Sequence, residues 1–324
     1  MKKIREDNLA VINNLLVYFS AMLRSMTQIF MNSYDFPNCL DTNGEIAGLY
    51  VNRHIKYPFQ SLAEEETKRD QQGIPLEYSY SLVVPAYNEE KRILPFMKQL
   101  STMLPSNWEV IIVCDGTDKT AKIAREADYK FKVMEFEQRL GKGGAILEGF
   151  KASNGDVVGY VDADGAISVH EVKKVFSHIS GDCDVAVGSR WVKNSNVIVR
   201  QPLLRVILGR LYHYAAFAIL GIPTKDTQCG VKAFKIGTLQ RVLPHLTLKN
   251  LSFDTAILYH CKKLGSRITE VPITWKDVDG SKVRPVKAAM VMFSSLVGIR
   301  LAHSNKHRKL SGLLESIRML LEKA

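Results

Sequence analysis

The feature that most constrains the fold is a regular alternation of short apolar runs and helical stretches that begins at Tyr80. The apolar runs are strand candidates and the segments between them are helix candidates. This order predicts an α/β protein with a mostly parallel sheet flanked by helices. The expected strands cover residues 80–86, 109–114, 131–136, 156–162 and 184–188. The expected helices cover residues 90–104, 119–127, 142–153 and 170–180.

Polar motifs follow the first three of these strands, at the strand ends where such sheets bind ligands. They are Pro85-Ala86-Tyr87-Asn88-Glu89, then Asp115-Gly116, then Gly141-Lys142-Gly143-Gly144. Each also has a purely structural interpretation as the start of the next helix, and both interpretations can hold together. The glycine motif differs from a Walker-type loop, and the first strand lacks the Gly-x-Gly-x-x-Gly of dinucleotide dehydrogenases.

Two carboxylates one residue apart, Asp162 and Asp164, end the apolar run of residues 157–161. Residues i and i+2 of a strand point the same way, so both side chains can face one ligand. Hard oxygen donors at a strand end suit Mg²⁺ or Mn²⁺ carrying a diphosphate. An Asp-x-Asp alone is more often a pair of solvated loop carboxylates, and the neighbouring motifs are what favour a metal site.

The chain of 324 residues carries a formal charge of +11. This charge indicates an anionic partner, such as a nucleotide, a phospholipid surface or a nucleic acid, although it also fits simple solubility. A nucleic-acid binder is disfavoured, because the chain lacks the interleaved basic and aromatic residues of a known module. The five cysteines have no pairing or zinc spacing, which favours a reducing compartment without a disulfide framework.

Both ends of the chain have the spacing of amphipathic helices. Apolar residues between Leu9 and Phe30 recur every three or four positions, with polar interruptions that argue against a bilayer span. This helix is expected to pack on the body, on a partner or on a membrane surface. A basic segment at residues 303–309 precedes a second amphipathic pattern. The apolar stretches at residues 211–222 and 286–302 suit either a membrane interface or core packing.

Taken in order, the motifs resemble those of inverting family-2 glycosyltransferases of the nucleotide-diphospho-sugar (GT-A) fold, over residues 79–301. Later segments resemble the dolichyl-phosphate β-glucosyltransferase branch, which is related to the dolichyl-phosphate mannosyltransferases. Gly188-Ser189-Arg190 is among the family-2 motifs, and the later segments are Asp226-Thr227-Gln228-Cys229-Gly230, Phe253-Asp254, and Trp275 with Gly280-Ser281-Lys282.

The resemblance implies roles for individual residues. Asp162 and Asp164 would hold a Mg²⁺ or Mn²⁺ ion, and Asp226, Asp164 and Arg190 would be the catalytic residues. Arg190 and Arg205 would grip the phosphate of an acceptor lipid. The nucleotide-sugar would contact Pro85, Tyr87, Glu89, Asp115, Lys142 and Asp162. The chain departs from the family pattern at Cys114, where a second Asp is usual, and at Ala166, where mannosyltransferases have a Gln metal ligand.

The activity implied by this resemblance is inverting transfer of glucose from UDP-glucose to a dolichyl (polyprenyl) phosphate, at the cytoplasmic face of a membrane. Such an acceptor is already an anion, so it needs positioning by arginines more than a general base. A GDP-mannose donor, a saccharide acceptor and a nucleotide-sugar-binding protein without turnover remain alternatives, and the oligomeric state is open. The expected domains are an N-terminal helix and connector (1–78), the catalytic domain (79–301) and a C-terminal tail (302–324).

Overall fold

The structure is a computed structural model that describes residues 78–127, 129–278, 280 and 285–302. The expected N-terminal helix, the basic C-terminal tail, Cys39, Ser281 and Lys282 lie outside these residues. The described residues form two compact units. One contains the sheet, and the other contains residues 207–220 and the helix that ends the described part of the chain.

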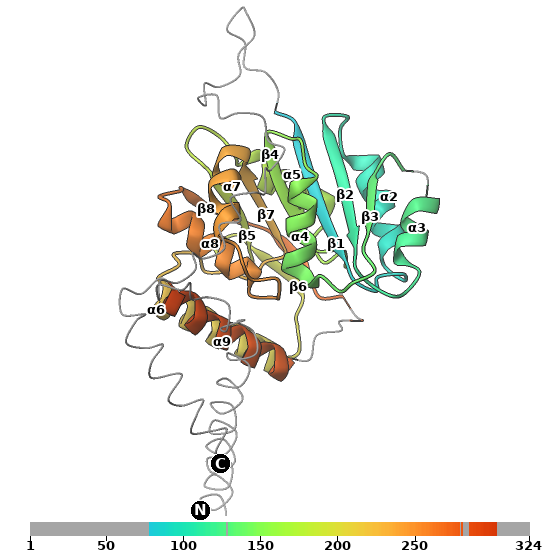
Figure 1. Cartoon of the computed structure of the whole chain (residues 1–324). Coiled ribbons are helices and arrows are strands. Elements are labelled where there is room, and N and C mark those ends of the chain that lie inside the picture. The colour runs from blue at the N-terminus through green and yellow to red at the C-terminus, as the bar shows by residue number, and fades with distance from the viewer. Residues whose placement is uncertain (1–77, 128, 279, 281–284, 303–324) are drawn as a thin grey trace, which may run out of the picture. The chain divides into compact units, whose positions relative to one another are not determined.

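A seven-stranded sheet forms the centre of the larger unit, in the order β3-β2-β1-β4-β7-β5-β8 (Figure 1). Its strands are β1 (Tyr80–Ala86), β2 (Trp108–Cys114), β3 (Lys132–Glu135), β4 (Val157–Val161), β5 (Val185–Ser189), β7 (Val231–Lys235) and β8 (Ile268–Pro272). The pairs among β1 to β4 and the pair of β5 with β8 are parallel, and β7 alone runs antiparallel to its two neighbours. This arrangement confirms the predicted mostly parallel sheet, and all five predicted strands are present.

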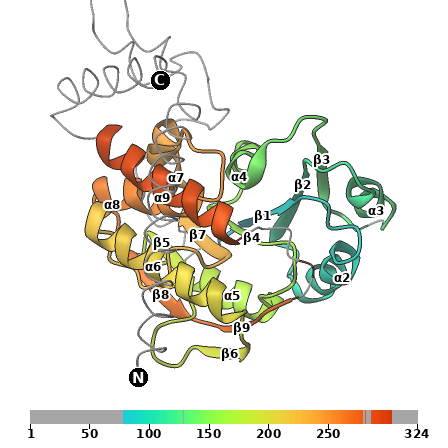
Figure 2. The ribbon, with the colours of Figure 1, turned by 90° about the horizontal axis from the view of Figure 1, so that it is seen from below.

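Helices cover both faces of the sheet (Figure 2). On one face, α2 (Ile93–Met103), α3 (Thr120–Glu126) and α5 (Val169–Ser177) bury their apolar sides in a continuous core. On the other face lie α4 (Gly141–Lys151), α7 (Ile236–Val242) and α8 (Phe253–Lys263), and the short 3₁₀ helix η2 (Leu243–His245) directly follows α7. Aromatic rings of Phe150, Tyr160, Phe234 and Phe253 contact one another on that second face.

The antiparallel strand β7 is the topological feature that brings a later segment to the ligand-binding edge. Val231 at the start of β7 pairs with Val161 at the end of β4. The loop that leads into β7 therefore lies beside the residues that follow β4, and Asp162 N donates to Gly230 O over 3.0 Å. The short strands β6 (Asn196–Val199) and β9 (Thr274–Lys276) form a separate parallel pair.

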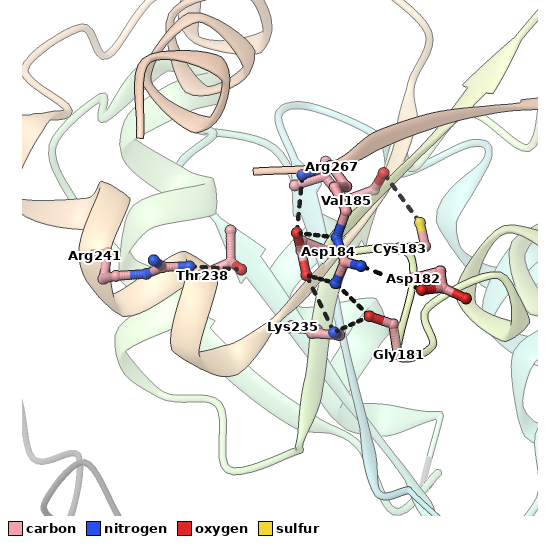
Figure 3. A network of polar contacts seen from close by, with 9 residues as sticks. All are labelled: Gly181, Asp182, Cys183, Asp184, Val185, Lys235, Thr238, Arg241 and Arg267. Carbon is pink, nitrogen blue, oxygen red and sulfur yellow. Dashed lines mark hydrogen bonds and ion pairs between the residues drawn. The ribbon is translucent and has the colours of Figure 1, made fainter. Parts of the chain in front are cut away.

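A polar network around Asp184, the residue before β5, lies at the strand ends opposite to the ligand-binding edge (Figure 3). Its Oδ2 accepts hydrogen bonds from Arg267 N at 2.8 Å and Arg267 Nε at 3.2 Å, and its Oδ1 accepts from Lys235 Nζ at 3.1 Å. Burial acts to raise the pKa of Asp184, but these donors outweigh it and hold the pKa well below its ordinary value. The network joins the starts of β5 and β8 to the end of β7.

Two apolar helices belong wholly or largely to the smaller unit: α6 (Leu203–Leu220) and α9 (Pro285–Ala302). They lie side by side (Figure 2), and the rings of Tyr212 and Phe293 meet edge to face with centroids 5.7 Å apart. The helix α6 contains most of the apolar stretch 211–222, and α9 contains the stretch 286–302. Among the helices that the structure describes, none is long and apolar enough to cross a membrane.

Candidate active site

The loops that follow β1 and β2 are tied together at the carboxyl edge of the sheet. Asn88 has a positive φ of 54° and its Oδ1 accepts from Thr117 N at 2.8 Å and from Asp118 N at 3.3 Å. A Cβ on Gly116 would lie 2.4 Å from this oxygen, so only glycine permits the approach. The predicted helix from residue 90 accordingly begins later, at Ile93, because residues 90–92 form a turn.

Asp115 and Tyr87, both predicted to contact the nucleotide, are connected through Arg139. The buried Asp115 carboxylate accepts from Leu140 N at 3.0 Å, Gly141 N at 2.9 Å and Arg139 Nη1 at 2.7 Å. The Arg139 guanidinium lies 3.3 Å from the centroid of the Tyr87 ring. Asp115 therefore anchors the start of the glycine motif. Arg139 was missed by the sequence analysis, although it stands two residues before that motif.

Glu89, predicted to contact the nucleotide-sugar, forms a two-pronged ion pair with Arg92. Both N–O distances, from Nε to Oε2 and from Nη2 to Oε1, are 2.7 Å. Burial acts to lower the pKa of Arg92, but Glu89 outweighs it and raises the pKa, with a further contribution from Asp164. The Arg92 guanidinium thus lies within electrostatic reach of Asp164, one of the two predicted metal ligands. Pro85 is part of β1 beside it.

The predicted donor residues Lys142 and Asp162 meet in a chain of four charges. Lys142 Nζ lies 2.9 Å from Asp162 Oδ1 and 3.0 Å from Asp254 Oδ2. Asp254 Oδ1 lies 2.6 Å from Lys232 Nζ and also accepts from the Tyr160 hydroxyl. Burial acts to raise the pKa of Asp254, but the two lysines outweigh it and lower the pKa to about 2. In the sequence, Asp254 stands out only as part of the motif Phe253-Asp254, and no motif marks Lys232.

The two carboxylates predicted to bind metal both lie beyond β4, which ends at Val161, and Asp164 stands in a turn, so the expected alignment of the two side chains along one strand does not apply. Asp162 directly follows β4 and its side chain is 36% exposed. Asp164 Oδ1 accepts from Ala166 N at 3.0 Å across a turn in which Gly165 has a φ of 72°. Two hard carboxylates fit Mg²⁺ or Mn²⁺, which commonly take their other ligands from substrate phosphates and water. Within the described part of the chain, no group of three His, Cys, Asp or Glu residues is placed to hold a metal ion.

Asp226 and Arg190, both predicted to be catalytic, form a bidentate pair. Arg190 Nε lies 2.7 Å from Asp226 Oδ2 and Nη2 lies 2.9 Å from Oδ1, while Arg190 N also donates to Oδ2 at 3.0 Å. Burial acts to raise the pKa of Asp226, but Arg190 outweighs it and lowers the pKa, so the carboxylate stays ionised. The guanidinium also lies 5.3 Å from the Trp275 ring centroid.

Gly230 connects this pair to the predicted metal ligands. A Cβ at Gly230 would lie 2.3 Å from Asp162 Oδ2, so the loop between Asp226 and β7 packs directly on that carboxylate. Burial acts to lower the pKa of Arg190, but Asp226 outweighs it and raises the pKa. The charge of Asp162 contributes in the same direction as Asp226. The structure therefore places Asp162, Lys142, Asp226 and Arg190 around one edge of the sheet. Arg205, predicted to grip the lipid phosphate, has its Nη1 4.0 Å from Asp277 Oδ1.

Two glycines of the third motif, Gly141 and Gly143, are required by protein packing. Gly141 has a φ of 75°, and a Cβ there would lie 2.6 Å from Lys249 O. A Cβ at Gly143 would lie 2.6 Å from Phe253 Cβ. The start of α4 therefore touches the start of α8, and this contact brings Asp254 to Lys142.

The cysteines in the described residues are buried and form no disulfide: they are Cys114, Cys183, Cys229 and Cys261. Cys114, where the family pattern usually has an acid, packs in the core, and burial raises the pKa of its thiol to about 12. A neutral thiol there leaves Asp115 as the acid at the end of β2.

A mostly parallel sheet with paired carboxylates after its central strand, beside lysine and arginine side chains, defines a glycosyltransferase of the nucleotide-diphospho-sugar class. The model of the family "Glycosyl transferase family 2" matches residues 81–243. The chain belongs to glycosyl transferase family 2, which confirms the family expected from the motifs.

Curated relatives narrow the comparison. The dolichyl-phosphate beta-glucosyltransferase of Dictyostelium discoideum is 32% identical over 270 residues, covering 77% of this chain and 80% of the relative. The protein of the same name from Saccharomyces cerevisiae is 35% identical over 249 residues, covering 69% and 74%. The Homo sapiens protein of that name is 28% identical, covering 81% and 87%.

Solved structures confirm the fold. Glucosyl-3-phosphoglycerate synthase from Mycobacterium tuberculosis in complex with uridine diphosphate has a TM-score of 0.53 to this chain at 20% identity. The match covers 69% of this chain and 79% of that chain. The same enzyme has been crystallised with Mn²⁺, UDP-glucose and phosphoglyceric acid. At this identity the likeness concerns the fold alone.

Proposed function

We propose that this enzyme transfers glucose from UDP-glucose to the phosphate of a dolichyl-type polyprenyl phosphate, with inversion and with a divalent cation. The observation that carries the choice of acceptor is the pairing of Asp226 with Arg190. A saccharide hydroxyl needs a base to take its proton, whereas a phosphate monoester already carries negative charge at neutral pH. The Asp226 carboxylate is buried and engaged by the Arg190 guanidinium. This arrangement suits a phosphate acceptor, because the carboxylate orients the arginine and no base is needed.

The acceptor side of the proposed site rests on Arg190. Pairing with Asp226 uses Nε and Nη2 of its guanidinium. Among the described residues Nη1 has no partner, which leaves a donor for a phosphate oxygen. The named activity of the curated relatives supports the same acceptor class. Arg205 is proposed as a second phosphate contact on the resemblance alone.

The donor side rests on the neighbouring cluster. The nucleoside would lie beside Tyr87, which Arg139 covers on one side, and beside Asp115 and Glu89, which are held by Arg139 and Arg92, while Lys142 supplies a cation beside Asp162. Asp162 and Asp164 would hold a Mg²⁺ or Mn²⁺ ion, which when bound neutralises the negative charge that grows on the leaving diphosphate. Lys142 and Arg190 add positive charge at the same edge.

We also propose that the protein works at an anionic, cytoplasmic membrane surface. One face of α6 presents five exposed apolar residues at helical spacing, each between 47% and 74% exposed. They are Leu203, Ile207, Leu211, Tyr214 and Phe217. The segment 185–225 contains six lysines and arginines and no Asp or Glu, which complements an anionic surface. Sedimentation with vesicles checks this: binding should require anionic lipid, and full binding to neutral vesicles in high salt would contradict it.

The decisive experiment is a transfer assay with purified protein, polyprenyl phosphate and Mg²⁺ or Mn²⁺. UDP-glucose should support product formation, GDP-mannose should not, and Asp164→Asn should lower the rate by about 100-fold or more. Unchanged turnover in the variant at saturating Mn²⁺ would exclude the metal role of Asp164. A preference for GDP-mannose would assign the mannosyl donor, and transfer to a saccharide hydroxyl would replace the proposed acceptor.

A further inference from the structure

We propose that Asp254 is a positioning residue that holds the Lys142 ammonium group at the donor diphosphate, an inference that rests on the proposed function. Lysine has a flexible four-carbon stem, so an ammonium group at a site edge needs an anchor to stay in one place. Lys142 Nζ touches two carboxylates, Asp162 at 2.9 Å and Asp254 at 3.0 Å. The two carboxylates differ in burial and in the contacts that hold each of them in place.

Asp162 is the weaker anchor of the two. Its side chain is 36% exposed and belongs to the proposed metal site, so a bound ligand competes for its oxygens. The Asp254 side chain is 1% exposed and engages Lys142 through Oδ2. Its other oxygen, Oδ1, is fixed by Lys232 Nζ at 2.6 Å and by the Tyr160 hydroxyl. Asp254 therefore keeps its place when Asp162 is occupied.

The backbone around Asp254 is built to reach Lys142. Asp254 stands in the first turn of α8 and Lys142 in the first turn of α4. Gly143 permits contact with Phe253, and Gly143 N donates to Lys249 O at 3.0 Å. The two neighbouring motifs, Gly-Lys-Gly-Gly and Phe-Asp, thus form one unit although more than a hundred residues separate them.

The charges of this unit favour a functional role over a purely structural one. Asp162 and Asp254 balance Lys142 and Lys232, and the Lys232 side chain is fully buried. Burying a lysine–carboxylate pair costs desolvation, and apolar side chains of similar volume usually stabilise a core at least as well. The chain of contacts becomes accessible at Lys142 and Asp162, whose side chains are 17% and 36% exposed. That is where an anionic ligand meets it.

The test compares nucleotide binding by the full-length protein and by Asp254→Asn, using calorimetry with UDP and with uridine. UDP affinity should fall about tenfold or more in the variant, because a charged contact to the diphosphate is lost. Uridine affinity should stay within about twofold, since the base side of the site is untouched. In the Lys142→Met background, Asp254→Asn should have no further effect on UDP affinity. The KM for UDP-glucose should rise and the KM for polyprenyl phosphate should not.

A second variant guards against misfolding. Asp254→Asn leaves Lys142 and Lys232 facing one carboxylate, whereas Asp254→Asn combined with Lys232→Met restores charge balance and still leaves Lys142 without its anchor. This double variant should show the same selective loss of UDP affinity, with thermal unfolding as the check of folding. Asp184→Asn, which removes a paired carboxylate at the far edge of the sheet, is the matched control and should bind UDP normally.

The outcomes separate this inference from the proposed function. If the wild-type protein binds UDP and both Asp254 variants bind it equally well, Asp254 does not position Lys142. Equal losses of UDP and uridine affinity would mean a general structural role and would also overturn the inference. If the wild-type protein binds neither UDP nor UDP-glucose, the proposed function fails, and this inference fails with it.

Discussion

At the scale of single residues, several carboxylates of the site form ion pairs with lysine or arginine side chains. Asp226 is the clearest case, because its carboxylate engages the main chain and the guanidinium of Arg190. We expect Asp226→Asn to lower kcat/KM for polyprenyl phosphate by about 10- to 100-fold, the cost of losing a hydrogen-bonded charge pair. UDP affinity, measured by calorimetry, should hardly change. Because Arg190 lowers the pKa of Asp226, the wild-type rate should show no limb from this group between about pH 5 and 8. A matching loss of UDP affinity would place the pair on the donor side.

At the scale of elements, the contact between the starts of α4 and α8 decides whether the cluster assembles. A methyl group at Gly143 would lie 2.6 Å from Phe253 Cβ and 2.9 Å from Leu248 O, so one helix must move. We expect Gly143→Ala to lower the free energy of unfolding by about 1–3 kcal/mol, measured by urea denaturation, and to weaken UDP binding. Gly144→Ala is the control, because its closest contact, Leu140 Cβ, is 3.1 Å away, and alanine is the better helix former. Equal losses in both variants would show that helix packing at Gly143 is not special.

At the scale of the whole molecule, the polar network around Asp184 (Figure 3) connects the strand ends that lie away from the site. Since the pKa of Asp184 is held below its ordinary value of 3.8, its stabilising effect is complete above that value and declines as the pH falls through the folded-state pKa. We expect Asp184→Asn to lower the Tm by about 2–4 °C at pH 7 and by less at pH 3. Asp182→Asn removes a fully exposed partner of Arg267 and should shift the Tm by no more than about 1 °C. A Tm deficit for Asp184→Asn that persists unchanged at pH 3 would contradict the pairing.

Much of the architecture follows from local pattern. The five predicted strands and their intervening helices depend on runs of neighbouring residues, and they are present with small shifts at their ends. The positions of Asp115, Lys142 and Asp162 at one edge follow from parallel strand direction, because the carboxyl ends of such strands meet. The motif order also predicted the family, which the family match confirms. The roles of the site residues and the membrane location remain predictions.

The sequence by itself determined the strands β1 to β5, the helices between them, the motif order and the family, because these depend on residues close together along the chain. Only the tertiary structure decided which charges are paired. The antiparallel course of β7 brings Asp226 and Lys232 to the end of β4, and the start of α8 brings Asp254 to Lys142. Arg139 likewise meets Tyr87 and Asp115 only once three loops converge. An ion pair depends on distances of a few ångströms between segments far apart in sequence, and periodicity carries no information on those distances.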